Sequence, residues 1–279
     1  MRSFFVGILF RVKIKKTLIL LVFFCIIILD PDTIYLYNLS QILMLKILDK
    51  KRFLGVDFWE FGIRSMNRRL GAEIIGNLLF SHPIRSIRGF LRYGHYLAQG
   101  KPKMRLPVET IPRLRPLLIG AYCQKPKGCP AGRFNHRCLF AETLTTYSSC
   151  EYCDLKKMAE LAAILRCSFY IMTTALDVLI DIFLGKTFPH FLVMICAYAK
   201  GLFLFPALIF NMEGWAFTLG RGSCRNYQEF LLADMGSKWN QTFLSPLSHK
   251  SFINLYRQIK ISNDYQRLIR KGHFYTPSS

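Results

Sequence analysis

The residues best suited to chemistry in this sequence are cysteines, five of which lie between positions 123 and 153. These five are Cys123, Cys129, Cys138, Cys150 and Cys153; the other four are Cys25, Cys167, Cys196 and Cys224. Two residues separate Cys150 from Cys153, a spacing that lets both thiolates point at one metal ion. The stretch therefore predicts a metal centre held by cysteine, with disulfides and ordinary free thiols as the alternatives.

The spacing of these cysteines also bears on the kind of metal. A structural zinc ribbon uses two close pairs of cysteines, whereas Cys123, Cys129 and Cys138 are irregularly spaced. Iron–sulfur clusters tolerate irregular loop spacing, and basic side chains nearby offset their negative charge. Such side chains are present at Lys125, Lys127, Arg133 and Arg137. We therefore expect an iron–sulfur cluster, with zinc as the alternative and His136 as a possible substitute ligand.

The second half of the chain predicts the sheet that must position any such site. An amphipathic helix is expected over residues 152–166, with Leu155, Met158, Ala162 and Leu165 facing inward. Three apolar runs follow, CSFYIMTT, HFLVMICAY and GWAFTL, and helical stretches separate them. This alternation predicts a small parallel α/β sheet. An alternative joins residues 190–211 into one transmembrane helix, at the cost of an internal lysine and proline.

Two cysteines outside the dense stretch acquire a role from this predicted sheet. Cys196 lies near the end of the second strand, and Cys224 lies just after the third. The carboxyl ends of parallel strands meet at one edge, where α/β proteins bind ligands. Cys196 and Cys224 are therefore candidates for a shared site and join the five others as possible metal ligands. Cys167 precedes the first strand and is expected to be a buried structural thiol at the opposite edge.

The chain as a whole is predicted to be an α/β protein in which a helical, basic region precedes a small parallel-sheet domain with a Cys-rich loop. The expected segments are an apolar anchor-like segment (1–32), a basic helical region (33–106), the Cys-rich loop (107–153), the α/β domain (154–245) and a polar C-terminal tail (246–279).

The N-terminal region and the charge suggest a membrane surface as a partner. The net charge of +21 favours anionic partners. The apolar run from Leu18 to Leu29 is shorter than the roughly 20 residues of a bilayer span, and no cleavage site follows it. We expect an anchor within residues 17–29, with an apolar surface helix or an over-long start as alternatives. Arg85, Arg88 and Arg92 form one helical stripe that suits either lipid or solvent.

Two further arguments concern partners and location. Nucleic acid is disfavoured, because no RNP, zinc-finger or homeodomain pattern accompanies the basic charge. Basic residues before Leu18 would place the rest of the chain outside a membrane, whereas clustered thiolates favour the reducing cytosol. The cysteine clustering leads us to expect the cytoplasmic face.

Signatures of known enzymes are missing, so whether the chain is an enzyme stays open. HExxH, GxSxG and GxGxxG do not occur, and Ile180 stands where a phosphate-binding loop ending in Gly185-Lys186-Thr187 needs its first glycine. Cys224 is a candidate nucleophile, because it precedes a predicted helix whose N-terminus would lower its pKa. His136 or His190 would have to serve as the base.

The segment from Glu151-Tyr152-Cys153 through FYIMTT, LVMICAY, GWAFTL and GRGSC, about residues 150–228, resembles an uncharacterised cysteine-rich α/β family. The resemblance implies an α/β fold and a metal centre, and it implies no activity. The leading hypothesis is an iron–sulfur protein with a redox or structural role. The alternatives are a membrane protein without a metal and a thiol-dependent enzyme that uses Cys224.

Overall fold

The computed structural model describes residues 82–85, 87–89, 91–92, 110–185, 188–260 and 265–278. The chain separates into two compact units, and the described residues belong to the one made of His82–Tyr93 and Lys101–Ser279. The predicted anchor within residues 17–29, the whole of segment 1–32 and most of segment 33–106 lie outside the described residues. Within the described part of the chain, every helix is too short or too polar to cross a bilayer.

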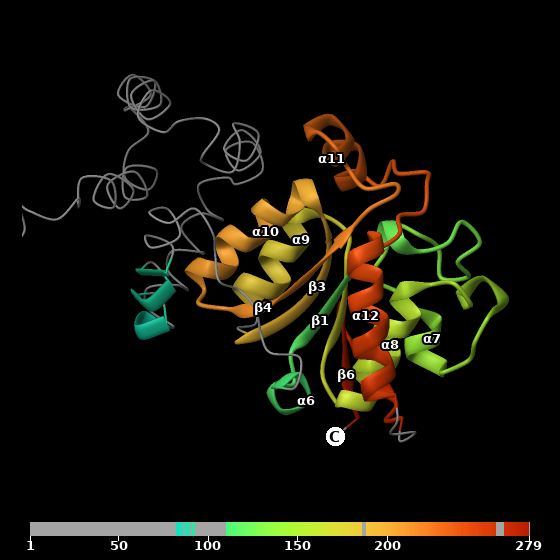
Figure 1. Ribbon diagram of the computed structural model, residues 1–279, viewed down its shortest axis with the longest axis horizontal. Coiled ribbons are helices and arrows are strands. Elements are labelled where there is room, and N and C mark those ends of the chain that lie inside the picture. The colour runs from blue at the N-terminus through green and yellow to red at the C-terminus, as the bar shows by residue number, and fades with distance from the viewer. Residues whose placement is uncertain are drawn as a thin grey trace, which may run out of the picture. The chain divides into compact units, whose positions relative to one another are not determined.

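The centre of the domain is a six-stranded sheet in the order β4-β3-β1-β2-β6-β5 (Figure 1). The strands are β1 (Leu117–Ala121), β2 (Phe169–Met172), β3 (His190–Cys196), β4 (Glu213–Leu219), β5 (Leu268–Lys271) and β6 (Phe274–Pro277). The first four pair in parallel, while β6 pairs antiparallel with both β2 and β5. The predicted α/β fold is confirmed.

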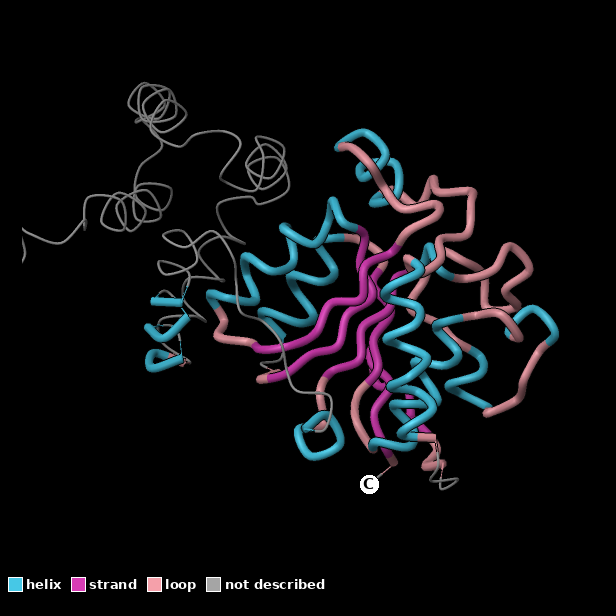
Figure 2. The backbone as a smooth tube through the Cα atoms, viewed as in Figure 1, coloured by secondary structure: helices cyan, strands magenta, loops and turns pink. Residues whose placement is uncertain are grey.

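Helices cover both faces of this sheet (Figure 2). One face carries α8 (Asp154–Leu165) and α12 (Pro246–Ile259), and the other carries α9 (Ala175–Val178), the π-helix η5 (Leu179–Gly185) and α10 (Ala197–Ile209). Shorter elements are α6 (Ile111–Leu114), η3 (Tyr122–Gln124), α7 (Leu139–Thr143), η4 (Ser148–Cys150) and α11 (Tyr227–Asp234). The central strands are therefore shielded from water on both sides.

Local sequence explains the best-formed elements. The inward side chains expected of α8, among them Leu155, Met158 and Ala162, are buried, and Asp154 in its first turn complements the helix dipole. Strand β3 is buried from Phe191 to Cys196, a continuous apolar run of the kind found where both faces of a parallel strand are covered. Hydrophobic burial thus fixes the strands that carry the cysteines.

The sheet domain is larger than the predicted 154–245. Strand β1 lies within the segment expected to be a Cys-rich loop, and α12, β5 and β6 lie within the segment expected to be a polar tail. Strands β5 and β6 form a hairpin that apolar patterning in the sequence does not reveal. In β5 only Leu268 is buried, and in β6 only Phe274 and Tyr275 are. Residues 190–211 form β3, α10 and a turn rather than one continuous helix.

The basic stripe falls partly within the described residues. Positions 83–85, 87–89 and 91–92 are helical, as expected. Arg88 is exposed, but Arg92 donates a 2.9 Å hydrogen bond to Asn211 Oδ1 and lies 3.8 Å from Glu213. Arg92 therefore contacts the turn before β4, and a role for the stripe in binding lipid stays a prediction.

The close pairing of β3 and β4 gives a test of this packing. Gly214 lies opposite Phe191, and a Cβ atom added there would lie 2.3 Å from the Phe191 carbonyl oxygen. Backbone cannot move aside cheaply, so we expect Gly214→Ala to lower the free energy of unfolding by about 1–3 kcal/mol in denaturant titration. Gly128→Ala is the control, since its nearest atom would be 4.0 Å away. Equal stabilities would contradict the pairing.

Candidate functional site

The sheet topology singles out one point on the edge formed by the strand ends. The chain runs from β1 to β2 on one side and then returns to place β3 on the other side of β1. In α/β sheets, ligands bind outside the carboxyl ends of the strands at such a reversal. Here β1 leads into Cys123, β3 ends at Cys196, and β4 is followed by the turn that carries Cys224.

Three cysteines and a lysine gather at this point, and we call Cys123, Cys196, Cys224 and Lys238 the switch-point group. The Lys238 ammonium donates a 3.1 Å hydrogen bond to the sulfur of Cys224. The thiol of Cys196 lies within hydrogen-bonding range of the same sulfur, and its own sulfur accepts a 3.3 Å bond from the Ala199 amide. Cys123 is close enough to interact electrostatically with Cys224 and Lys238.

The electrostatics of this group favour one negative charge, on Cys224. Hydrogen bonding from Cys196 and then from Lys238 outweighs partial burial and lowers the pKa of Cys224 to about 6. The same hydrogen bond, together with burial, raises the pKa of Cys196, and burial raises the pKa of Cys123. The other charged group that acts on Cys224 is Glu229, which opposes the charge. A negative charge on this pair is therefore favoured on Cys224 rather than on Cys196.

The lysine reaches this site because two loops are tied together. Arg133, in the Cys-rich loop, donates hydrogen bonds to the carbonyl oxygens of Lys238 at 2.8 Å and Asn240 at 3.0 Å. The amide of Thr242 donates a 2.8 Å bond to the carbonyl oxygen of Cys123. These bonds hold the segment after α11 against the end of β1, where Lys238 meets Cys224.

Four of the remaining cysteines form a second set, and we call Cys129, Cys138, Cys150 and Cys153 the loop group. Cys138 interacts electrostatically with Cys150 and Cys153, and Cys153 does so with Cys150 and Cys129. Burial raises the pKa of Cys138 to about 12 and that of Cys153 to about 11. These thiols are protonated at neutral pH, so a metal would have to displace their protons.

A buried lysine holds the loop group together. Lys125 is only 2% exposed, and its ammonium donates hydrogen bonds to the carbonyl oxygens of Gly132 (3.2 Å) and Asn135 (2.8 Å) and to Asn135 Oδ1 (2.7 Å). Burial lowers its pKa to about 8, against the opposing effect of the nearby cysteines, chiefly Cys129. The loop is therefore folded around a cation that faces Cys129, Cys138 and Cys153.

The separation of the thiols distinguishes between metals. Zinc–thiolate bonds of about 2.3 Å in a tetrahedron place sulfur atoms about 3.8 Å apart. In the part of the chain that the structure describes, no three cysteine sulfurs all lie within 4.8 Å of one another. An iron–sulfur cluster holds its thiolates farther apart, because several ligands bind different iron atoms. All of the described cysteines are free thiols.

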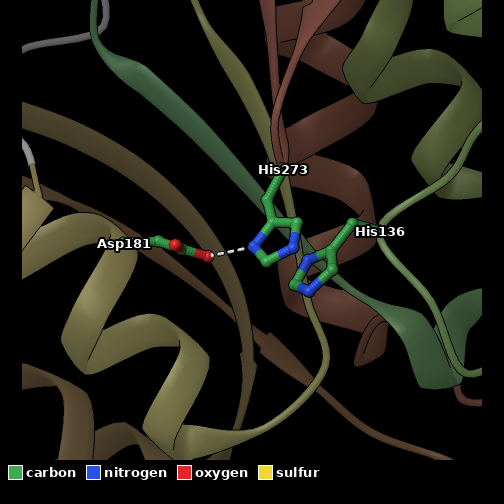
Figure 3. Close-up of side chains that lie close together, drawn as sticks. All are labelled: His136, Asp181 and His273. Carbon is green, nitrogen blue, oxygen red and sulfur yellow. Dashed lines mark hydrogen bonds and ion pairs between the residues drawn. The ribbon is translucent and has the colours of Figure 1, made fainter.

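The three side chains that do approach closely are His136, Asp181 and His273 (Figure 3). His273 Nδ1 lies 2.7 Å from Asp181 Oδ2, and the two imidazole rings stack with centroids 3.8 Å apart and planes 11° apart. Nitrogen lone pairs lie in the ring plane, so stacked rings do not converge on one ion. Both ring nitrogens of His136 already have partners: Nδ1 lies 2.8 Å from the Ile171 carbonyl oxygen, and Nε2 lies 3.1 Å from the Thr173 hydroxyl. The trio is best described as a hydrogen-bonded stack.

This stack, with Tyr275, joins the C-terminal hairpin to the Cys-rich loop. His273 lies between β5 and β6, and Tyr275 in β6 accepts a 2.7 Å hydrogen bond from the Cys138 amide and donates a 3.0 Å bond to Glu142. Burial, and then His273, lower the pKa of His136, so the ring that lies against the hairpin is neutral at pH 7. The segment expected to be a polar tail therefore supports the loop group.

The structure thus divides the seven predicted ligands, four into the loop group and three into the switch-point group. Cys196 and Cys224 are near enough to share a hydrogen bond, and Cys167 is a buried thiol just before β2. His136 and His190 do not serve Cys224: His136 lies in the stack, and His190 begins β3 at the opposite edge.

Several important residues escaped the sequence analysis. Lys238, Arg133 as a loop tie, Tyr275 and Asp181 are brought to their partners only by the folded chain. Lys238 and Arg133 lie in loops, Tyr275 lies in β6 and Asp181 lies in η5, so the four share no local sequence signal.

Comparisons of this chain with protein-family models, curated proteins and solved structures find no match. The resemblance of residues 150–228 to a cysteine-rich family therefore stays a prediction.

The role of Lys125 can be tested by removing its charge. Lys125→Met keeps the apolar stem but leaves the Gly132 and Asn135 oxygens without their donor, so we expect a loss of roughly 1–3 kcal/mol in the free energy of unfolding. Lys127→Met is the matched control, because Lys127 is exposed. Denaturant titrations that coincide for both variants would contradict a structural role for this cation.

The charge on Cys224 can be tested by the pH dependence of its alkylation. The thiolate is the reactive form, so its rate should rise through a midpoint near pH 6 and level off above pH 7. Lys238→Met should move that midpoint upward, toward the ordinary thiol value of about 8.5, while Lys250→Met on the exposed side of α12 should not. Peptide mass spectrometry resolves the site, and a wild-type midpoint above 8 would refute the assignment.

Proposed function

We propose that this protein is an iron–sulfur protein in which Cys129, Cys138, Cys150 and Cys153 bind the cluster. The observation that carries the proposal is the loop group itself, four thiols gathered in one loop around the buried ammonium group of Lys125. Four thiolates are the usual ligand set of both the two-iron and the four-iron cluster.

Charge supports this assignment. A cluster with four thiolate ligands carries net negative charge, which is costly to bury without compensation. Lys125 supplies a buried cation next to three of the four thiols. Its ammonium is held by Gly132 and Asn135, so it would not need to move when a cluster binds. Zinc is less well supported, because no three of the described cysteine sulfurs all lie within 4.8 Å of one another.

The exposure of the four cysteines bears on the role of the cluster. Cys150 and Cys153 are buried, whereas Cys129 and Cys138 are partly exposed. A cluster held here would have one edge shielded and one edge near the surface, where an electron could enter or leave. This arrangement favours electron transfer over a purely structural role.

The test is the iron and acid-labile sulfide content of the anaerobically purified full chain, with its visible spectrum. We expect iron and sulfide in equal amounts, and we expect both to be lost in Cys150→Ala and Cys153→Ala because each removes a ligand. Cys167→Ala is the matched control, since Cys167 is a buried thiol just before β2 and outside the loop group.

Two results would contradict the proposal. Zinc without sulfide would make the site a structural zinc centre. If the chain holds neither iron nor zinc and the loop-group thiols are freely alkylated in the native chain, Lys125 would be the centre of a metal-free loop.

A further inference from the structure

The switch-point group is left unused by the proposed cluster, and its geometry differs from that of the loop group. The thiol of Cys196 lies within hydrogen-bonding range of the Cys224 sulfur, whereas Cys123 hydrogen-bonds to Thr242 and interacts with Cys224 only electrostatically. The three sulfurs do not all lie within 4.8 Å of one another, so this group does not present a three-thiolate site for one ion. The arrangement is a pair of thiols with a lysine on one of them.

We propose that Cys196 and Cys224 are a redox-active dithiol, in which Cys224 reacts with a small hydroperoxide and Cys196 then closes a disulfide. Cys224 is the attacking sulfur because Lys238 donates a 3.1 Å hydrogen bond to it and the Cys196 thiol lies within hydrogen-bonding range of it. Cys196 is the resolving sulfur because its thiol lies within hydrogen-bonding range of the Cys224 sulfur, so the two side chains need only approach each other to close the bond.

The exposure of the pair selects the oxidant. Cys224 is 6% exposed and Cys196 is 8% exposed. In exchange with a bulky disulfide, the Cys224 thiolate would have to reach a sulfur of that disulfide in line with the bond that breaks. The burial of Cys224 and Cys196 obstructs this approach. Hydrogen peroxide is not much larger than water and can reach a thiolate through a small opening. Gly222 and Arg225, which flank Cys224 on the chain, are exposed, so the turn that carries Cys224 lies at the surface.

The reaction balances with hydrogen peroxide as the only oxidant. The Cys224 thiolate attacks one oxygen, a sulfur–oxygen bond forms as the oxygen–oxygen bond breaks, and the departing hydroxide takes a proton from Lys238 to become water. Cys196 then attacks the sulfenic sulfur of Cys224; the sulfur–sulfur bond forms, and the leaving hydroxide combines with the proton released by Cys196. A dithiol reductant returns both thiols and is itself oxidised to a disulfide. Lys238 then regains its proton from the restored Cys224 thiol, which becomes the thiolate again.

The two strands carrying the pair give the device a structural basis. Cys196 is the last residue of β3, and Cys224 lies in the turn just after β4, which pairs with β3 over its whole length. A disulfide would join the ends of two neighbouring strands, near the start of α10, where Cys196 accepts the Ala199 amide. Disulfide formation would remove the proton of the Cys196 thiol, whose sulfur accepts from Ala199. It would also remove the Cys224 thiolate to which Lys238 donates.

The experiment treats the full anaerobic chain with one equivalent of hydrogen peroxide, blocks remaining thiols with N-ethylmaleimide and maps the peptides by mass spectrometry. We expect a Cys196–Cys224 peptide pair lighter by two hydrogens, reversed by dithiothreitol. Cys196→Ala should stop the reaction at a sulfenic acid on Cys224 that dimedone traps. Lys238→Met should slow oxidation about tenfold at pH 7, because the thiolate fraction falls, while Lys250→Met should not.

Cys123→Ala is the matched control within the group, and it should still form the Cys196–Cys224 disulfide. The proposal is overturned if the pair stays reduced while other cysteines oxidise, or if Cys224 goes directly to sulfinic acid with Cys196 present. Loss of bound iron in Cys224→Ala would also overturn it, because Cys224 would then be a metal ligand. The disulfide is read without reference to metal, so its absence would leave the loop-group cluster untouched.

Discussion

The parallel pairing of β3 with both β1 and β4 is the constraint on which both cysteine groups depend. The register aligns Leu118 with Leu192 and Cys196 with Leu219, so that three strands end at one edge of the sheet. From that edge β1 leads into the Cys-rich loop, and β3 and β4 deliver Cys196 and Cys224. Burial of the apolar strands, rather than any bond between cysteines, therefore places the reactive sulfur atoms.

The Cys-rich loop contributes few large apolar side chains, and polar contacts hold it in place. Lys125 gathers the carbonyl oxygens of the loop, Arg133 ties it to the segment after α11, and Tyr275 binds the Cys138 amide. Buried polar groups are tolerated only when they are hydrogen-bonded, as the Lys125 ammonium and the Cys138 amide are. The result is a loop whose shape is fixed by donors and acceptors, which suits a site that must hold thiols apart until a cluster binds.

Sequence reasoning succeeded where burial leaves a periodic pattern and failed where partners meet only in the fold. The helix α8, the strands β2, β3 and β4, and the meeting of Cys196 with Cys224 followed from apolar spacing and strand order. Strand β1 and the β5–β6 hairpin were missed, because the first is a single short run within a Cys-rich segment and the second shows only a few buried residues.

The division of the cysteines into a loop group and a switch-point group could not be read from spacing either. Cys123 and Cys129 are close in the chain, yet η3 and the turn at Lys125 direct them to different groups. Lys238 lies fourteen residues after Cys224, and only the ties from Arg133 and Thr242 bring the two together. Charge and hydrogen bonding across the fold, which leave no local signature, decide the chemistry of each sulfur.

The central claim is that four cysteines bind a cluster and the other three at the sheet edge do not. The most direct measurement is the iron K-edge X-ray absorption spectrum of the anaerobic full chain, compared with that of the triple variant Cys123→Ala, Cys196→Ala and Cys224→Ala. The account predicts sulfur ligation with short iron–iron scattering, the same in both proteins. An absence of iron–iron scattering, or a changed first coordination shell in the triple variant, would contradict it.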